Sequence, residues 1–224
     1  MNMPFTIREE NGLHVLRDDL VSGGTKRRGL YLLLRSLNAE SVFYAGTTMG
    51  HGALALALAG RDTGKKINIV ISAKENDPYV LRLRDAGATV HLCKPLPVDI
   101  LHEQATSMAE GAPVFPPGFA TPEFAGSLSG ALAKLDVSAF PEIWVASVTG
   151  TLARALKKTF PKAMVRTVSV VKNGAPCDFT APEKYHQPAK SPPPYPACPY
   201  TDAKVWRFAQ KHAKPGALIW NTAG

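Results

Sequence analysis

Short apolar and β-branched runs alternate with helical patterns along most of this chain. Residues 41–45 (SVFYA) and 67–72 (INIVIS) are typical of buried strands, and residues 27–37 carry leucines at helical spacing. Further strands are predicted at 13–17, 89–92, 143–146, 164–171 and 217–220, and further helices at 53–59, 78–86, 124–135, 151–159 and 203–213. This alternation predicts an α/β fold with mainly parallel sheets.

Residues 173–200 interrupt the alternation. They are dense in proline and include the run 192–194 (PPP), which excludes a regular helix or a central strand. A long irregular segment within a compact protein is usually a functional loop or a linker. We therefore expect residues 173–200 to be a Pro-rich functional loop or a linker.

The charge of the chain is unusual. Lysine and arginine number 26 against 18 acidic residues, which gives a net charge of +8. A basic excess of this size favours polyanionic partners, and duplex DNA is one of them. The alternative is a solvated basic surface without such a partner.

The cysteine spacing and the hydropathy of the chain exclude several classes of protein. The three cysteines, Cys93, Cys177 and Cys198, lack the spacing of a metal site, so neither a metal nor a disulfide framework is predicted. The sequence has no apolar run of the roughly 18 residues that a membrane helix requires, and its N-terminus does not resemble a secretory signal. We therefore expect a cytoplasmic protein that does not bind membranes.

The first of three polar turns contains a candidate nucleophile. Lys26 follows Gly23 and Gly24 at the start of a predicted helix. The positive end of the helix lowers the pKa of a nearby ammonium, and a less protonated lysine attacks aldehydes more readily. The alternatives are a surface lysine and a lysine that binds an anion.

Two more turns join a predicted strand to a predicted helix. In residues 46–52, backbone amides and the hydroxyls of Thr47 and Thr48 suit a carboxylate, although either threonine could simply cap the helix. In residues 147–151, small and hydroxylic side chains suit a phosphate. The 147–151 turn lacks the sequence motifs of ATP-binding and dinucleotide-binding sites. The candidate residues of the two turns are Thr47, Thr48, Gly50 and His51, and Ser147, Thr149, Gly150 and Thr151.

These segments together resemble one enzyme family. Residues 17–30 (RDDLVSGGTKRRGL) are similar to the R-E-D…G-G-N-K-x-R-K-L segment of fold-type II pyridoxal phosphate (PLP) enzymes. The aminocyclopropane carboxylate deaminase and D-cysteine desulfhydrase branch is the most similar. Residues 147–153 resemble its G-S-G-G-T-L-A-G loop, residues 200–204 (YTDAK) its Y-E-G-K element, and residues 218–224 (LIWNTAG) its closing H-T-G-G.

The resemblance implies specific roles. Lys26 would hold PLP as a Schiff base, the 147–151 turn would bind the cofactor phosphate, and Thr222 would face the pyridine nitrogen. The 46–52 turn, with Tyr200, would bind the substrate. The sequence departs from the family at Gly50, where an asparagine is expected, and at Ala146 and Val148, where glycines are usual.

The resemblance also implies a fold and a function. We expect a single unit with a small subdomain at 39–115 and a large one at 1–38 and 116–224, built around a cofactor cleft, and a homodimer is compatible with it. Short relatives occur in bacteriophages, where some decarboxylate an amino acid attached to thymidine in DNA. With the charge of +8, this suggests a PLP-dependent lyase acting on DNA, with Arg27 and Arg28 as backbone contacts. The alternatives are a lyase or deaminase of a free small amino acid and an inactive binding protein of the same fold.

Overall fold

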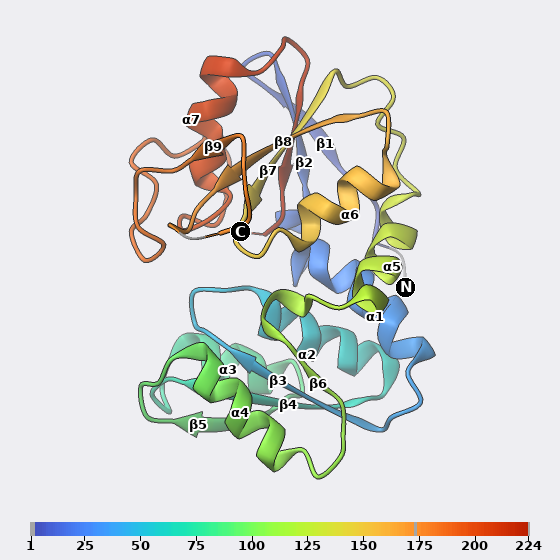
Figure 1. Ribbon diagram of the computed structural model, residues 1–224, viewed down its shortest axis with the longest axis vertical. Helices are drawn as coiled ribbons and strands as arrows, with labels where there is room; N and C mark the ends of the chain where they lie inside the picture. The colour runs from blue at the N-terminus through green and yellow to red at the C-terminus, as the bar shows by residue number, and fades with distance from the viewer. Residues whose placement is uncertain (1–2, 173, 224) are drawn as a thin grey trace.

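The structure is a computed structural model that describes residues 3–172 and 174–223. Asn173, the first residue of the predicted Pro-rich segment, and Gly224, the last of the C-terminal motif, lie outside the described residues. Two sheets, one of six strands and one of four, lie at opposite ends of the molecule with helices between them (Figure 1). The predicted α/β fold is confirmed.

The four-stranded sheet is entirely parallel and has the order β5-β4-β3-β6. Alternate side chains of its strands enter two different cores, as the two-residue period of a strand requires. One face packs on α2, a helix of alternating leucine and alanine, and the other packs on α4. The elements are β3 (Ser41–Gly46), α2 (Gly52–Thr63), β4 (Lys66–Ser72), α3 (Pro78–Asp85), β5 (Thr89–Cys93), α4 (Val98–Met108) and β6 (Val114–Phe115).

The six-stranded sheet has the order β1-β2-β10-β7-β8-β9 and combines the two ends of the chain. Among the described strands of this sheet, only β1 runs antiparallel to its neighbour. One face packs on α7, and the other on α5 and α6. The elements are β1 (Ile7–Glu10), β2 (Leu13–Arg17), α1 (Gly24–Ser36), α5 (Pro122–Leu132), β7 (Glu142–Ser147), α6 (Thr151–Thr159), β8 (Met164–Ser169), β9 (Phe179–Thr180), α7 (Ala203–His212) and β10 (Leu218–Asn221), with short 3-10 turns η1 (Asp18–Leu20) and η2 (Pro117–Phe119).

Helix α1 joins the two halves. It packs on α2 of the four-stranded half and on α5 of the other, so that one hydrophobic core runs through both. Gly29 permits the close approach of α5, because a Cβ there would lie 2.9 Å from the Cα of Leu128. All strands of the smaller sheet come from residues 41–115, which supports our proposal of a small subdomain at 39–115.

Every predicted helix and strand is present, but some elements were not predicted. β1 (IREE) carries charges at the edge of its sheet, and α4 has only two buried residues, so neither gives a clear apolar period. β9 forms within the Pro-rich segment, at the edge of the sheet where the lack of pairing on one side is tolerated. No helix of the described residues is long and apolar enough to cross a membrane.

The expectation that Arg27 and Arg28 contact DNA is wrong. Arg28 is buried, and its guanidinium pairs with Asp18 at 2.6 Å while it also donates to backbone carbonyl groups near the N-terminus. Arg27 is largely buried and pairs with Asp62 at 2.7 Å. Neither guanidinium is free to reach a phosphate, because both bind carboxylates within the protein.

We predict that Asp18→Asn lowers the free energy of unfolding by about 3–5 kcal/mol, because it leaves the buried charge of Arg28 without its partner. Urea unfolding measures the change. The matched control is Glu75→Gln, which removes the carboxylate of the exposed Arg84–Glu75 pair and should cost less than about 1 kcal/mol. Equal losses in the two variants would contradict the prediction.

Candidate active site

Two adjoining cavities lie where β3, β7 and β10 end, between the two sheets. Ligands in α/β proteins commonly bind beyond the carboxyl ends of parallel strands. The first cavity, of about 80 Å³, is lined by the start of α1, the start of α6 and the end of β10. The second, of about 290 Å³, extends toward the loop before α2. Lys26, Val148, Thr149, Thr201 and Thr222 line both.

Lys26 is the third residue of α1 and is half-buried at the junction of the cavities. Burial lowers its pKa, and the nearby Asp202 and Cys198 oppose that shift only in part. The direction agrees with the sequence prediction, but the principal cause is desolvation. The amine is therefore more readily deprotonated than that of an exposed lysine, which is what a nucleophile for an aldehyde requires.

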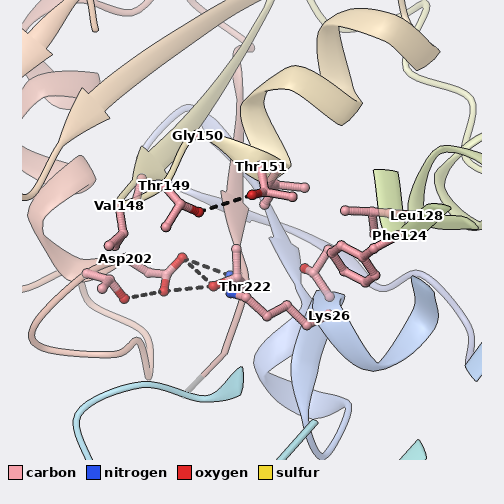
Figure 2. A pocket seen from close by; sticks show the side chains of 13 residues that line it. Lys26, Phe124, Leu128, Val148, Thr149, Gly150, Thr151, Asp202 and Thr222 are labelled. Atoms are coloured by element: carbon pink, nitrogen blue, oxygen red, sulfur yellow. Dashed lines mark hydrogen bonds between the residues drawn. The ribbon is translucent and has the colours of Figure 1, made fainter. Parts of the chain in front are cut away.

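The turn before α6 is shaped to bind an anion. Gly150 adopts a left-handed conformation (φ 75°) as the N-cap residue, and a glycine has no side chain that could cap the helix amides. The hydroxyls of Thr149 and Thr151 lie 3.1 Å apart beside these amides (Figure 2). All three residues line the first cavity. Amides, hydroxyls and the helix N-terminus together fit a phosphate.

Three predicted residues are not among the described residues that line either cavity: Ser147, Thr48 and Tyr200. Ser147 is buried, and because side chains alternate along a strand, it points away from the cavity that Ala146 and Val148 line. Thr48 is exposed at the tip of its loop. Tyr200 is half-buried outside the cavities, which its neighbours Thr201 and Asp202 reach instead.

The loop before α2 brings Thr47, Gly50 and His51 to the second cavity. The Tyr79 hydroxyl fixes this loop, because it donates to the Gly50 carbonyl at 2.5 Å and accepts from the Leu54 amide at 3.3 Å. Burial lowers the pKa of His51, so its imidazole is neutral at pH 7. The loop therefore presents a rigid backbone and a neutral histidine to the cavity.

The half-buried Thr222, which lines both cavities, pairs with the buried Asp202. One oxygen of the Asp202 carboxylate accepts a hydrogen bond from the Thr222 amide at 3.0 Å. Both carboxylate oxygens lie 2.9 Å from the Thr222 hydroxyl oxygen (Figure 2). It also accepts from the Thr201 hydroxyl at 2.8 Å. A carboxylate only accepts hydrogen bonds, so the Thr222 hydroxyl gives it its hydrogen and presents lone pairs to the cavity.

Sequence reasoning missed several side chains that line the site, and three of them are ionisable. Asp202 lies two residues after the tyrosine of the YTDAK motif, which was the available signal. Tyr44 lies within a predicted strand, where it looked like an ordinary core residue, yet it lines the second cavity. Tyr185 comes from the Pro-rich segment and lines the same cavity. Burial raises the pKa of Tyr185, and it raises the pKa of Tyr44 to about 12.

The comparisons with known proteins place this arrangement in a structural class. No protein-family model and no curated protein matches the sequence. Solved structures of deaminases and racemases acting on amino acids do match along nearly the whole chain. The chain has the two-subdomain fold of these enzymes, as predicted.

Three structures illustrate the similarity. An ACC deaminase homologue has a TM-score of 0.80 at 18% identity, over 99% of this chain and 90% of its own. A threonine deaminase from T.th. has a TM-score of 0.66 at 16% identity, over 95% and 87%. A pyridoxal 5'-phosphate-dependent aspartate racemase has a TM-score of 0.59 at 14% identity, over 97% and 74%.

We predict that Gly24→Ala disrupts the site. Gly24 has a positive φ of 62°, and a Cβ there would collide with the carbonyl oxygen of Thr222. The variant should unfold at clearly lower urea concentration and lose the contact between α1 and β10. Gly12→Ala is the control, because Gly12 also has a positive φ (76°) but has nothing within 4 Å of a new Cβ. If both variants lose the same stability, backbone strain alone explains the effect.

Proposed function

We propose that this protein is a PLP-dependent enzyme that acts at the α-carbon of an amino-acid group. The observation that carries the proposal is the desolvated amine of Lys26, which lies between an anion-binding helix terminus and the Thr222–Asp202 pair. A similar fold in a pyridoxal 5'-phosphate-dependent racemase supports it. When bound, PLP would stabilise a carbanion at the α-carbon of the substrate.

The residues of the first cavity fit the parts of this cofactor. The amides and hydroxyls of Thr149, Gly150 and Thr151 would hold the phosphate, and Lys26 would bind the aldehyde carbon. The Thr222 hydroxyl would face the ring nitrogen. Because that hydroxyl donates to Asp202, it would accept a hydrogen bond from a protonated ring nitrogen. The Asp202 charge would favour that protonated form.

The second cavity would hold the substrate. Its backbone amides and Thr47 hydroxyl suit a carboxylate, and the neutral His51 can accept a proton. Lys26, once displaced from the cofactor, would be the other group able to move a proton at the α-carbon. A volume of about 290 Å³ suits a small amino acid, so a lyase or deaminase of a free amino acid is the function that the geometry supports best.

A second candidate is a decarboxylase or lyase acting on an amino acid attached to phage DNA. The charge of +8 supports it, and so do exposed cations near the site. Arg82 borders a polar hollow that reaches His51, and Lys184 adjoins Tyr185 of the second cavity. These side chains replace Arg27 and Arg28 as candidate phosphate contacts.

We predict that Lys26→Ala abolishes covalent PLP binding. Wild-type protein mixed with PLP should absorb in the near-violet, and borohydride should then remove that absorbance and leave one covalently bound cofactor group in the mass spectrum; the variant should show neither the absorbance nor the added mass. Exposed-lysine variant Lys158→Ala is the control and should behave like wild type. An adduct that persists in Lys26→Ala would show that another lysine holds the cofactor.

The same reaction tests the pKa of Lys26. Because burial lowers this pKa, the rate of adduct formation should rise with pH and level off below 10.5, the ordinary value for lysine. A wild-type protein that forms no adduct at any pH would favour an inactive protein of this fold.

For the second candidate function, we predict that duplex DNA binds through phosphate contacts. Each contact adds about 0.9 to the negative slope of log affinity against log salt, so a handful would cost on the order of a hundredfold in affinity between low and physiological salt. Lys184→Gln should lower affinity in fluorescence anisotropy. Lys162→Gln, in the exposed turn between α6 and β8, should not. No binding at low salt, with turnover of a free amino acid, would exclude the DNA-linked substrate.

A further inference from the structure

The guanidinium of Arg154 turns back over the proposed phosphate loop. Arg154 is the fourth residue of α6, and helical side chains point toward the N-terminus of their helix. Its Nη1 donates to the Thr149 carbonyl at 3.1 Å, and its Nη2 lies 3.4 Å from the Thr151 hydroxyl. A Cβ added to Gly150 would lie 2.9 Å from Nη1. One side chain therefore contacts three consecutive residues of the loop.

The charged side chains around the first cavity do not balance the negative charge of a phosphate bound there. Lys26 and Asp202 are its only charged lining residues in the described part of the chain. Asp202 is negative, and the Lys26 amine is the group that would bind the aldehyde. The N-terminus of α6 supplies about half an elementary charge. A phosphate dianion beside Asp202 thus needs a further cation.

Arg154 is positioned to be that cation. Its position near the N-terminus of α6 is unfavourable for a positive side chain on its own, whereas Lys157 and Lys158 lie in the last turn, where the helix dipole favours them. Within residues 3–172 and 174–223, no carboxylate forms a salt bridge with Arg154. An anion bound at the loop would interact favourably with the positive end of the helix dipole and would serve as the counter-ion of Arg154.

The direction of its hydrogen bonds gives Arg154 a second effect. A guanidinium only donates, so the Thr151 oxygen accepts from Arg154 and keeps its own hydrogen for another acceptor. That acceptor is the Thr149 hydroxyl, 3.1 Å away, or an anion in the loop. Arg154 thus orients the Thr151 hydroxyl for donation to a phosphate.

We propose that Arg154 is the phosphate-selecting residue of this site: it balances the charge of the cofactor phosphate and orients the Thr151 hydroxyl toward it. This inference rests on the proposed function. It also predicts that the site discriminates PLP from pyridoxal, which has the same aldehyde and ring but no phosphate.

The test compares the affinity of the cofactor-free protein for PLP and for pyridoxal by fluorescence titration. Arg154→Gln should weaken PLP binding by about fivefold to tenfold and leave pyridoxal binding within about twofold. Arg154→Lys should restore part of the loss, because it keeps the charge but not the forked donor. Lys158→Gln, with the same charge change on the same helix, is the control and should retain wild-type affinity.

A double variant tests the link between the two side chains. Thr151→Val should itself weaken PLP binding, and adding Arg154→Gln to it should cost less than Arg154→Gln costs in the wild type. Circular dichroism and urea unfolding confirm that each variant is folded.

The outcomes separate this inference from the proposed function. Equal losses in Arg154→Gln and Lys158→Gln, or an equal loss for PLP and pyridoxal in Arg154→Gln, would overturn the role of Arg154 while PLP binding stands. A wild-type protein that binds neither aldehyde would overturn the proposed function, and the assignment of Arg154 with it.

Discussion

The site depends on one buried contact between segments nearly 200 residues apart in the sequence. Thr25 donates its amide to the carbonyl of Thr222 at 3.0 Å, and its hydroxyl joins the Trp220 indole at 2.9 Å to the Asp18 carboxylate at 2.6 Å. Arg28 neutralises that carboxylate. These bonds bring the first turn of α1 against the end of β10, so Lys26 and Thr222 face the same cavity. These polar groups are paired with one another in the protein interior, where an unpaired group would cost several kcal/mol.

The parts of the fold and site that the sequence predicted are those with local signals. Strand and helix periods located the parallel sheets, and Lys26, Thr149 and Gly150 were found because each belongs to a turn next to such an element. The other parts depend on distant partners. Arg27 and Arg28 resemble surface charges in sequence, and only the folded chain supplies Asp62 and Asp18 to bury them.

Tyr185 is a site residue whose position also could not be predicted from the local sequence. The Pro-rich segment has no period that would predict its path, which is set by packing on the six-stranded sheet and by contacts such as the one from Lys204 to the Lys184 carbonyl at 3.0 Å. That contact anchors the residue next to Tyr185. A buried lysine on α7 therefore helps to position a tyrosine that no local sequence pattern could assign to the substrate cavity.

The division of the site between the subdomains has a functional consequence. The phosphate loop, Thr222 and Asp202 belong to the six-stranded half, and α1, which carries Lys26, is bonded to that half through Thr25. The loop that would bind the substrate carboxylate belongs to the four-stranded half. Every group proposed to hold the cofactor thus belongs to the six-stranded half or is bonded to it. Because α1 also packs on α2, the helix that carries Lys26 connects the cofactor side of the site to the half that would bind the substrate.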